Sequence, residues 1–246
     1  MARFFLARER IQDRRGTIVG EELAHLRKVL RLAPGDHLTI FDDTGWEHEA
    51  VIRSFSANRG DIDILRSYQP ERESPLQITL ALGLTKGEKT DFVVEKATEL
   101  GVQTIVPFMS SYTVPKLNDR KIETRTGRWQ RIALSAAKQC GRTLVPKILM
   151  LCEFQELVRQ PRTDTLKLLF WEREGQLTLK QVYETEHDVR AILLVIGPEG
   201  GFSSEEAGET LRHGFRSVQL GRRILRSETA ALAALSVVQF LWGDMG

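Results

Sequence analysis

The sequence is poor in cysteine, since Cys140 and Cys152 are the only two among its 246 residues. They do not have the spacing of metal ligands, and two thiols cannot form the disulfide framework of a small secreted protein. The chain also lacks an apolar export signal near its start and any apolar run long enough to cross a membrane. We therefore expect a cytoplasmic protein that holds no metal.

Several nucleotide-binding and catalytic signatures are missing as well. The chain has no HExxH zinc motif, no GxGxxG dinucleotide motif, and no recognisable Ser-His-Asp or Cys-His set. The segment GLTKGEKTD at 83–91 is similar to a phosphate-binding loop, but only three residues separate its glycines and Glu88 precedes its second lysine. A carboxylate at that place repels phosphate, so we interpret the segment as a strand-to-helix turn in which Lys86 is a candidate RNA contact.

Positive charge is present in local excess, although the formal net charge is only +2. Residues 111–147 carry nine Lys or Arg against two acids, Asp119 and Glu123. Residues 212–226 carry five Arg and no acid. Local basic patches of this kind favour a polyanionic partner more than the total charge does.

The first seventy residues have the pattern of short strands separated by Gly, Asp and Asn turns. One helix fits residues 21–31 and ends before Pro34-Gly35, and a polar, proline-bearing linker follows at 69–75. This pattern predicts a small β-barrel-like domain over residues 1–70. The strands are expected at 3–7, 16–20, 36–42, 48–55 and 60–68.

From residue 76 onward, apolar strands alternate with amphipathic helices. Such alternation indicates an α/β domain with a mostly parallel sheet over residues 76–246. The strands are expected at 77–84, 104–109, 166–172, 191–197 and 217–221. The helices are expected at 90–101, 127–140, 154–160, 204–213 and 228–242.

The loop GPEGG at 197–201 follows a buried strand and precedes a helix. Its three glycines can adopt positive φ and let a ligand approach the backbone, while Pro198 stiffens the turn. Ser203 and Glu206 have the spacing of a capping box for the next helix. The loop is able to hold an adenine or ribose through backbone groups, although a plain strand–turn–helix joint fits the pattern equally well.

A second segment of the same kind, QLGRRILRSETAALAAL, spans 219–235. It passes from a strand end through Gly221 and a basic loop into a helix, with Ser227 as the expected N-cap and Glu228 in the first turn. Strand ends of a parallel sheet meet at one edge, where ligands commonly bind. The two glycine loops are therefore expected to form the walls of one pocket.

Together, GPEGGFS and LGRRILRSETAALAAL resemble the paired carboxy-terminal motifs of the RsmE family of SPOUT methyltransferases. HLRKVLRLAPGD at 25–36 is similar to the PUA-like amino-terminal domain of that family, and KGEKTDFVVEKATELGV at 86–102 and RWQRIALSAAKQCGR at 128–142 to its middle. The resemblance implies methylation of uridine N3 in 16S ribosomal RNA, S-adenosyl-L-methionine (SAM) as the methyl donor, a trefoil knot and a homodimer. The expected cofactor contacts are Ile196, Gly197, Pro198, Glu199, Gly200, Gly201, Leu220, Gly221, Ile224, Leu225, Arg226, Thr229 and Ala230.

Methyl transfer to uracil N3 requires alignment of donor and acceptor, and it requires removal of the N3 proton. Loss of that proton leaves negative charge on the ring, which a nearby arginine stabilises. Arg226 is our candidate for this role, with a phosphate contact or a carboxylate partner as the alternative. Glu199 is a candidate proton acceptor or loop-ordering residue, and Glu228 either positions Arg226 or serves only the helix dipole.

The helix over 128–142 has an apolar face that includes Trp129 and Ala136, opposite a stripe of cations without acids. The stripe favours contact with RNA phosphates, and the alternative is an ordinary solvated face. His25 is a further candidate, for which a core or capping role is equally possible. The candidate RNA contacts are His25, Arg31, Lys86, Arg128, Arg131, Lys138, Arg142, Arg222 and Arg223.

Two alternatives to a uracil-N3 methyltransferase acting on the small ribosomal subunit remain open at this point. The first is a SPOUT enzyme that methylates ribose 2′-hydroxyls of tRNA or rRNA. The second is an RNA-binding assembly factor without turnover, which needs no small-molecule pocket.

Overall fold

The computed structural model describes residues 2–113, 118–171 and 177–246. The chain divides into two compact units. The first contains the residues up to Glu73 together with Ala137–Val145, and the second contains Ser74–Ala136 and Pro146–Gly246. The sequence pattern suggested a division within 69–75 but gave no sign that 137–145 joins the first unit.

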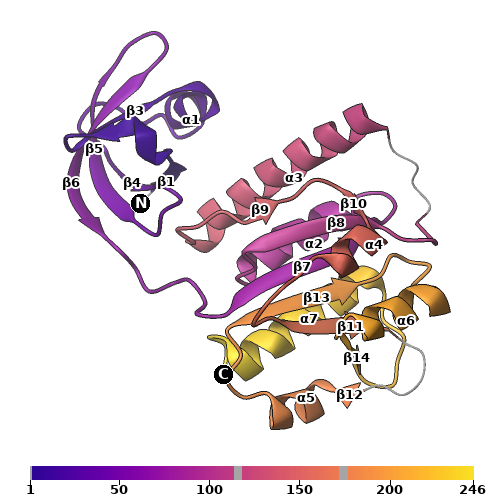
Figure 1. Cartoon of the computed structure of the whole chain (residues 1–246). Helices are drawn as coiled ribbons and strands as arrows, with labels where there is room; N and C mark the ends of the chain where they lie inside the picture. Colours follow the sequence, from indigo (N-terminus) through magenta and orange to yellow (C-terminus); the bar gives the residue numbers. More distant parts are fainter. Residues whose placement is uncertain (1, 114–117, 172–176) are drawn as a thin grey trace. The chain divides into compact units, whose positions relative to one another are not determined.

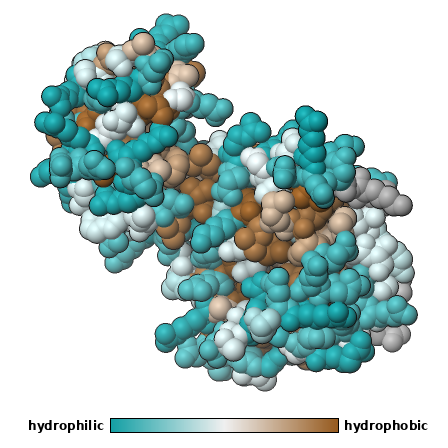
Figure 2. Space-filling model, turned by 45° about the horizontal axis from the view of Figure 1, so that its top comes forward, coloured by the Kyte–Doolittle hydropathy of each residue, from teal (hydrophilic) through white to brown (hydrophobic). Residues whose placement is uncertain are grey.

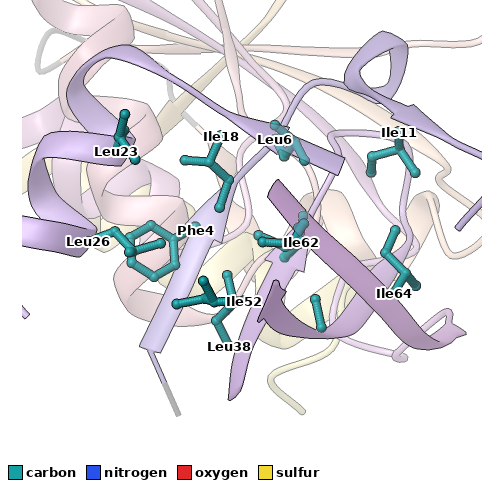
Figure 3. Close-up of a cluster of buried hydrophobic side chains, with 12 residues drawn as sticks. Phe4, Leu6, Ile11, Ile18, Leu23, Leu26, Leu38, Ile52, Ile62 and Ile64 are labelled. Carbon is teal, nitrogen blue, oxygen red and sulfur yellow. The ribbon is translucent and has the colours of Figure 1, made fainter. Parts of the chain in front are cut away.

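The first unit is built on a six-stranded sheet in the order β1-β4-β5-β6-β3-β2. β1 and β4 are parallel, and the other neighbours are antiparallel. Alternate residues of the strands point into one apolar core, which Figure 3 shows around Phe4, Ile52 and Ile62. The strands are Ala2–Phe5 (β1), Ile11–Gln12 (β2), Arg15–Ile18 (β3), His37–Phe41 (β4), Glu47–Phe55 (β5) and Gly60–Tyr68 (β6).

The prediction of one helix at 21–31 is only partly correct. An α-helix, α1, covers Gly20–Ala24 and continues as a π-helical turn over His25–Val29. Leu30 N donates to His25 O, the wider spacing typical of a π-turn. The turn keeps Leu26 in the core while Val29 is 67% exposed, and Arg31 ends the segment with φ of 54°. A 3.6-residue period does not predict this change of winding.

The second unit contains an eight-stranded sheet in the order β10-β8-β7-β13-β11-β14-β12, with β9 paired to β8. Every strand pairing described in it is parallel, which confirms the predicted sheet type. The strands are Gln77–Gly83 (β7), Thr104–Met109 (β8), Lys147–Ile148 (β9), Cys152–Glu153 (β10), Leu166–Phe170 (β11), Leu177–Thr178 (β12), Ala191–Ile196 (β13) and Arg216–Gln219 (β14). The strand predicted at 166–172 ends at Phe170, and Glu172 lies outside the described residues.

Helices flank this sheet, with α2 and α7 in contact with each other and α4 in contact with α6 (Figure 1). An apolar cluster holds α4 and α6 to the strands, and the rings of Phe108, Phe154 and Phe202 contact one another in it. None of the helices in the described ranges is long and apolar enough to cross a membrane. The helices are Lys89–Glu99 (α2), Asp119–Cys140 (α3), Phe154–Arg159 (α4), Leu179–Thr185 (α5), Ser204–Arg212 (α6) and Ser227–Trp242 (α7).

Two helices differ from the prediction. α3 begins at Asp119, well before the predicted residue 127. Its first residues are mostly polar, so hydrophobic periodicity did not reveal that they are helical. α5 was not predicted, although Thr178 and Gln181 form a capping box at its start. Short amphipathic helices give too few repeats for periodicity to reveal them.

Candidate functional site

The carboxyl ends of three neighbouring strands surround one pocket in the second unit. β11 lies between β13 and β14 in the sheet, so the loops that follow these strands come together at one edge. We call this the strand-exit pocket. It is lined by Phe170, Trp171, Ile196, Gly197, Pro198, Gly201, Phe202, Val218, Gln219, Leu220, Gly221, Arg222, Arg223, Ile224, Leu225, Ser227 and Ala230.

Both predicted glycine loops contribute to this pocket, as the sequence suggested. The predicted cofactor contacts that line it are Ile196, Gly197, Pro198, Gly201, Leu220, Gly221, Ile224, Leu225 and Ala230. Glu199, Gly200, Arg226 and Thr229 do not line it, and contact with the cofactor stays a prediction for all thirteen residues. On α7, Ser227 and Ala230 are three residues apart and share the face toward the pocket, which turns Thr229 away from it.

Ser227 has a different role from the predicted one. The N-cap of α7 is Arg226, and Ser227 is the first helical residue. The Ser227 hydroxyl is buried and donates to the carbonyl oxygen of Gly197 at 2.7 Å. This hydrogen bond joins the two glycine loops directly and fixes the start of α7 against the GPEGG turn.

The GPEGG turn also lies against the end of β7. Leu82 of β7 pairs with Ile196 of β13, so Gly83 stands opposite the start of the turn. A Cβ atom on Gly83 would lie 2.4 Å from the backbone nitrogen of Pro198. Only a glycine at position 83 permits this close approach of the two strand ends.

The glycines of the turn serve different purposes. Gly201 has φ of 68°, a left-handed conformation that favours glycine, whereas Gly197 and Gly200 do not have positive φ. A Cβ on Gly197 would lie 3.0 Å from the Phe202 ring, and one on Gly200 would lie 2.6 Å from Cβ of Tyr112. Gly200 therefore lets the turn pack against the segment that follows β8, rather than opening the pocket.

The predicted capping box of α6 is confirmed. The Ser203 hydroxyl accepts from Glu206 N at 3.1 Å, and Glu206 Oε2 accepts from Ser203 N at 2.9 Å. Glu206 Oε1 also accepts from the backbone amide of Ser111 at 2.8 Å and from its hydroxyl at 3.1 Å. One buried carboxylate thus anchors both the helix after the GPEGG turn and the segment after β8.

A lysine that the sequence did not single out connects the two predicted acids. Lys89 Nζ donates to Glu199 Oε1 at 3.0 Å and lies 3.8 Å from Glu228 Oε2. Burial of Glu199 favours its neutral form, but hydrogen bonds from Lys89 and from the backbone amide of Lys86 outweigh that effect. The pKa of Glu199 therefore lies below its ordinary value. Lys89 sits at the start of α2 and ties the GPEGG turn to that helix.

Arg226 is solvent-exposed between Leu225 and Ser227, both of which line the pocket. Over the described ranges, its side chain has no hydrogen-bond or ion-pair partner. Glu228, expected to position Arg226, instead faces Lys89, and its Oε2 atom is buried without a hydrogen bond among the described residues. The structure thus leaves an unpaired cation at the rim of the pocket.

Acids from distant segments pair with three of the predicted RNA contacts. Arg128 lies 2.5 Å from Asp91, and Lys138 lies 2.7 Å from Glu22. Arg142 is buried and donates to the Glu73 carboxylate at 2.7 Å, which gives it a structural role within the first unit. Among the described residues, the exposed candidates without an acid partner are Arg31 in the first unit and Lys86, Arg131, Arg222 and Arg223 in the second.

The remaining polar candidates offer little catalytic chemistry. His25 is half-buried with its ring 5.7 Å from that of Phe4. Burial raises the pKa of the Cys152 thiol to about 11, which leaves little thiolate at neutral pH. Within residues 2–113, 118–171 and 177–246, no three His, Cys, Asp or Glu residues are grouped to hold a metal ion.

Sequence reasoning missed the third wall of the pocket, formed by Phe170 at the end of β11 and by Trp171 directly after it. The predicted strand at 166–172 could have indicated this wall, because parallel strands of one sheet all end at the same edge. The strand at 166–170 lacks a following glycine motif, and its place between β13 and β14 depends on sheet order, which local patterns do not give.

Comparison with known proteins assigns both parts of the chain. The RNA methyltransferase domain family matches residues 72–239, and the RNA methyltransferase PUA domain family matches residues 18–65. The ribosomal RNA small subunit methyltransferase E of Bacillus subtilis (strain 168) is 30% identical over 247 residues, covering 98% of this chain and 96% of that protein. The protein of the same name from Synechocystis sp. (strain PCC 6803) is 33% identical over 97% of this chain and 77% of its own length.

Solved structures are similar over the full length. The ribosomal RNA small subunit methyltransferase E of Neisseria gonorrhoeae, bound to S-adenosyl methionine, is 33% identical with a TM-score of 0.89 and covers 100% of each chain. A Legionella pneumophila methyltransferase in complex with the bound cofactor SAM is 33% identical with a TM-score of 0.90, covering 99% of this chain and 98% of that one. These matches confirm the predicted methyltransferase fold with its PUA-like domain, and the trefoil knot stays a prediction.

Proposed function

This chain belongs to the ribosomal RNA small subunit methyltransferase E family, and we propose that it transfers a methyl group from SAM to N3 of a uridine in 16S ribosomal RNA. The observation that carries this proposal is the strand-exit pocket, in which the two motifs of the family resemblance form opposite walls. The hydrogen bond from Ser227 to Gly197 keeps those walls together.

The lining of the pocket suits SAM. Gly197, Gly201 and Gly221 leave backbone groups uncovered, and Phe170 and Phe202 supply apolar area for a flat ring. The Neisseria and Legionella relatives hold SAM in structures with the same fold. When bound, SAM supplies a methyl group on a positively charged sulfur, which is already reactive toward a nitrogen anion. The protein's tasks are then to orient the uracil and to stabilise its charge.

We assign charge stabilisation to Arg226. Uracil becomes anionic when N3 loses its proton, and a free guanidinium at the pocket rim is suited to that charge. Glu199 is better suited to ordering the GPEGG turn than to accepting the proton, because its pKa is lowered and Lys89 already engages it. Glu228 is the other candidate acceptor, because its Oε2 atom has no hydrogen bond among the described residues and lies farther from Lys89, at 3.8 Å.

The proposed RNA partner is the assembled small ribosomal subunit, which places the protein's action in the cytoplasm. Exposed cations are available to phosphates in both units, at Arg31 in the first and at Lys86, Arg131, Arg222 and Arg223 in the second. Sequence-specific RNA recognition favours unpaired, splayed-out bases, so the remaining RNA must be gripped through its backbone.

We further propose a homodimer formed through the second unit. Figure 2 shows apolar side chains gathered on one face of the larger unit, and α7 carries exposed apolar side chains of its own. On α7, Val237 is 38% exposed and Phe240 is 61% exposed, and the two are three residues apart on one face. Exposed apolar surface of this kind commonly marks a protein–protein contact.

The test combines binding with product analysis. Calorimetry with SAM should give a one-site isotherm, and small subunits lacking the modification should gain one methyl group when incubated with the protein and SAM. Mass spectrometry of the digested RNA should identify N3-methyluridine. A ribose-methylated nucleoside would indicate the 2′-hydroxyl enzyme instead, and SAM-independent binding without turnover would indicate an assembly factor.

A further inference from the structure

Trp171 is one of the residues that line the strand-exit pocket. It directly follows β11, the strand between β13 and β14, and its backbone amide donates to Val218 O of β14 at 3.4 Å. Its ring packs against the apolar cluster that contains Phe202, and the residue lines the pocket. The residue therefore contacts both the apolar cluster and the pocket.

The indole nitrogen of Trp171 is unusual in this chain. Nε1 is buried, yet it has no hydrogen-bond acceptor among the described residues. Two other tryptophans satisfy theirs, since Trp129 Nε1 donates to Asp91 at 2.9 Å and Trp242 Nε1 donates to Glu186 O at 2.7 Å. Buried indole N–H groups generally have a partner, so an unpaired one in a ligand pocket points to an acceptor on the ligand.

We propose that Trp171 is a cofactor-binding residue whose indole N–H donates a hydrogen bond to the adenosine part of SAM. This inference rests on the proposed function. The adenosine part carries ring nitrogens and ribose oxygens that accept hydrogen bonds, and its flat base suits a wall made of Phe170, Trp171 and Phe202. The charged methionine part is less suited to that wall, since an ammonium and a carboxylate need polar or charged partners.

The first test is calorimetry on the full chain with SAM, adenosine and methionine as separate probes. Trp171→Phe keeps an aromatic ring but removes the N–H. We expect it to weaken SAM and adenosine binding by the same factor, about tenfold, which corresponds to the loss of one hydrogen bond. Trp242→Phe is the matched control, because it removes an N–H that is bonded to Glu186, and it should leave SAM affinity unchanged.

The second test observes ligand binding in the wild-type protein and uses the variant only to assign one signal. The chain has four tryptophans, so a ¹⁵N-labelled wild-type sample gives four indole N–H signals. The signal absent from Trp171→Phe should move downfield when adenosine is added, and the other three should move little.

The outcomes separate this inference from the proposed function. If wild-type protein does not bind SAM, the proposed function falls and the assignment of Trp171 falls with it. If wild-type protein binds SAM while Trp171→Phe binds it equally well, or while the Trp171 indole signal stays in place, only the assignment of Trp171 is overturned.

Discussion

At the scale of single residues, the tertiary structure separates cations that look alike in the sequence. Arg128 and Lys138 lie on a helix stripe without acids, but Asp91 and Glu22 reach them from other segments. Arg226 is exposed and lacks such a partner among the described residues. Charge counts along the chain cannot make this distinction, because the acids involved are 37 to 116 residues away.

Arg226 therefore gives the most direct test of the proposed chemistry. Arg226→Ala should lower kcat about a hundredfold, the usual cost of losing one group that stabilises transition-state charge. The affinity for SAM should change little, because Arg226 does not line the strand-exit pocket. Single-turnover methylation of small subunits, together with calorimetry, measures both quantities. Arg212→Ala, an exposed arginine at the end of α6, is the control, and equal losses in turnover and SAM affinity would make Arg226 a binding residue.

Glu47 in the first unit predicts a pH dependence of stability. Its buried carboxylate accepts from Tyr68 Oη at 2.7 Å and from Arg72 at 3.0 Å, and it pairs with Arg3. Burial favours the neutral form of Glu47, but the hydrogen bonds from Tyr68 and Arg3 outweigh it, so the pKa lies below the ordinary value of 4.5. A lowered folded-state pKa stabilises the unit above the unfolded pKa, and this contribution is lost as the pH falls through the folded pKa.

The corresponding variant is Glu47→Gln, which cannot titrate. At pH 7 it should reduce the free energy of unfolding by about 1–3 kcal/mol, since Arg3 and Arg72 lose the carboxylate that they share. The difference from wild type should shrink as the pH is lowered below about 4.5, the ordinary carboxyl pKa. Hydrogen exchange of the β4 and β5 amides reports on this unit. Glu49→Gln, a half-buried acid two residues along β5, serves as control, and a constant Glu47→Gln difference across the pH range would refute the explanation.

At the scale of the element, the sequence predicted those features that depend on neighbouring residues. The capping box of α6 and the apolar strands β7, β8 and β13 are local patterns, and the structure confirms them. The π-turn at His25–Val29 and the role of Ser227 were not predictable in this way. The first follows from packing of Leu26 in the core, and the second from a carbonyl thirty residues away.

The end of β7 provides a prediction at this scale. Gly83→Ala places a methyl group 2.4 Å from the backbone of Pro198, which no side-chain rotation can relieve. The GPEGG turn must shift, so SAM affinity should fall at least about tenfold and stability by about 1–3 kcal/mol. Calorimetry and thermal unfolding measure the two effects.

Gly127 is the matched control for this exchange. It lies within α3, and a Cβ there would meet nothing within 4 Å. Gly127→Ala should stabilise the helix by up to about 1 kcal/mol and leave SAM affinity unchanged. Normal SAM binding by Gly83→Ala would show that the close approach of the two strand ends is not needed for the pocket.

At the scale of the whole molecule, the alternation of strands and helices gave the parallel sheet, but not the order of its strands. The sequence also did not indicate that residues 137–145 belong to the first unit. It depends on Glu73, whose carboxylate accepts from the Arg142 side chain and from the amides of Thr143 and Leu144. Contacts between residues about 70 positions apart leave no periodic trace in a single sequence.

The proposed homodimer yields a prediction for the assembled molecule. Phe240 is 61% exposed on α7, beside Val237, and an aspartate at position 240 would carry charge into any apolar contact formed there. Phe240→Asp should therefore shift the protein from dimer to monomer in light scattering, while its melting temperature at low concentration changes little. Leu65→Asp is the control, because Leu65 is 45% exposed on β6 of the first unit and should leave the dimer intact. If Phe240→Asp remains a dimer, the contact must use another face of the second unit, since burying an unpaired carboxylate in an apolar interface costs several kcal/mol.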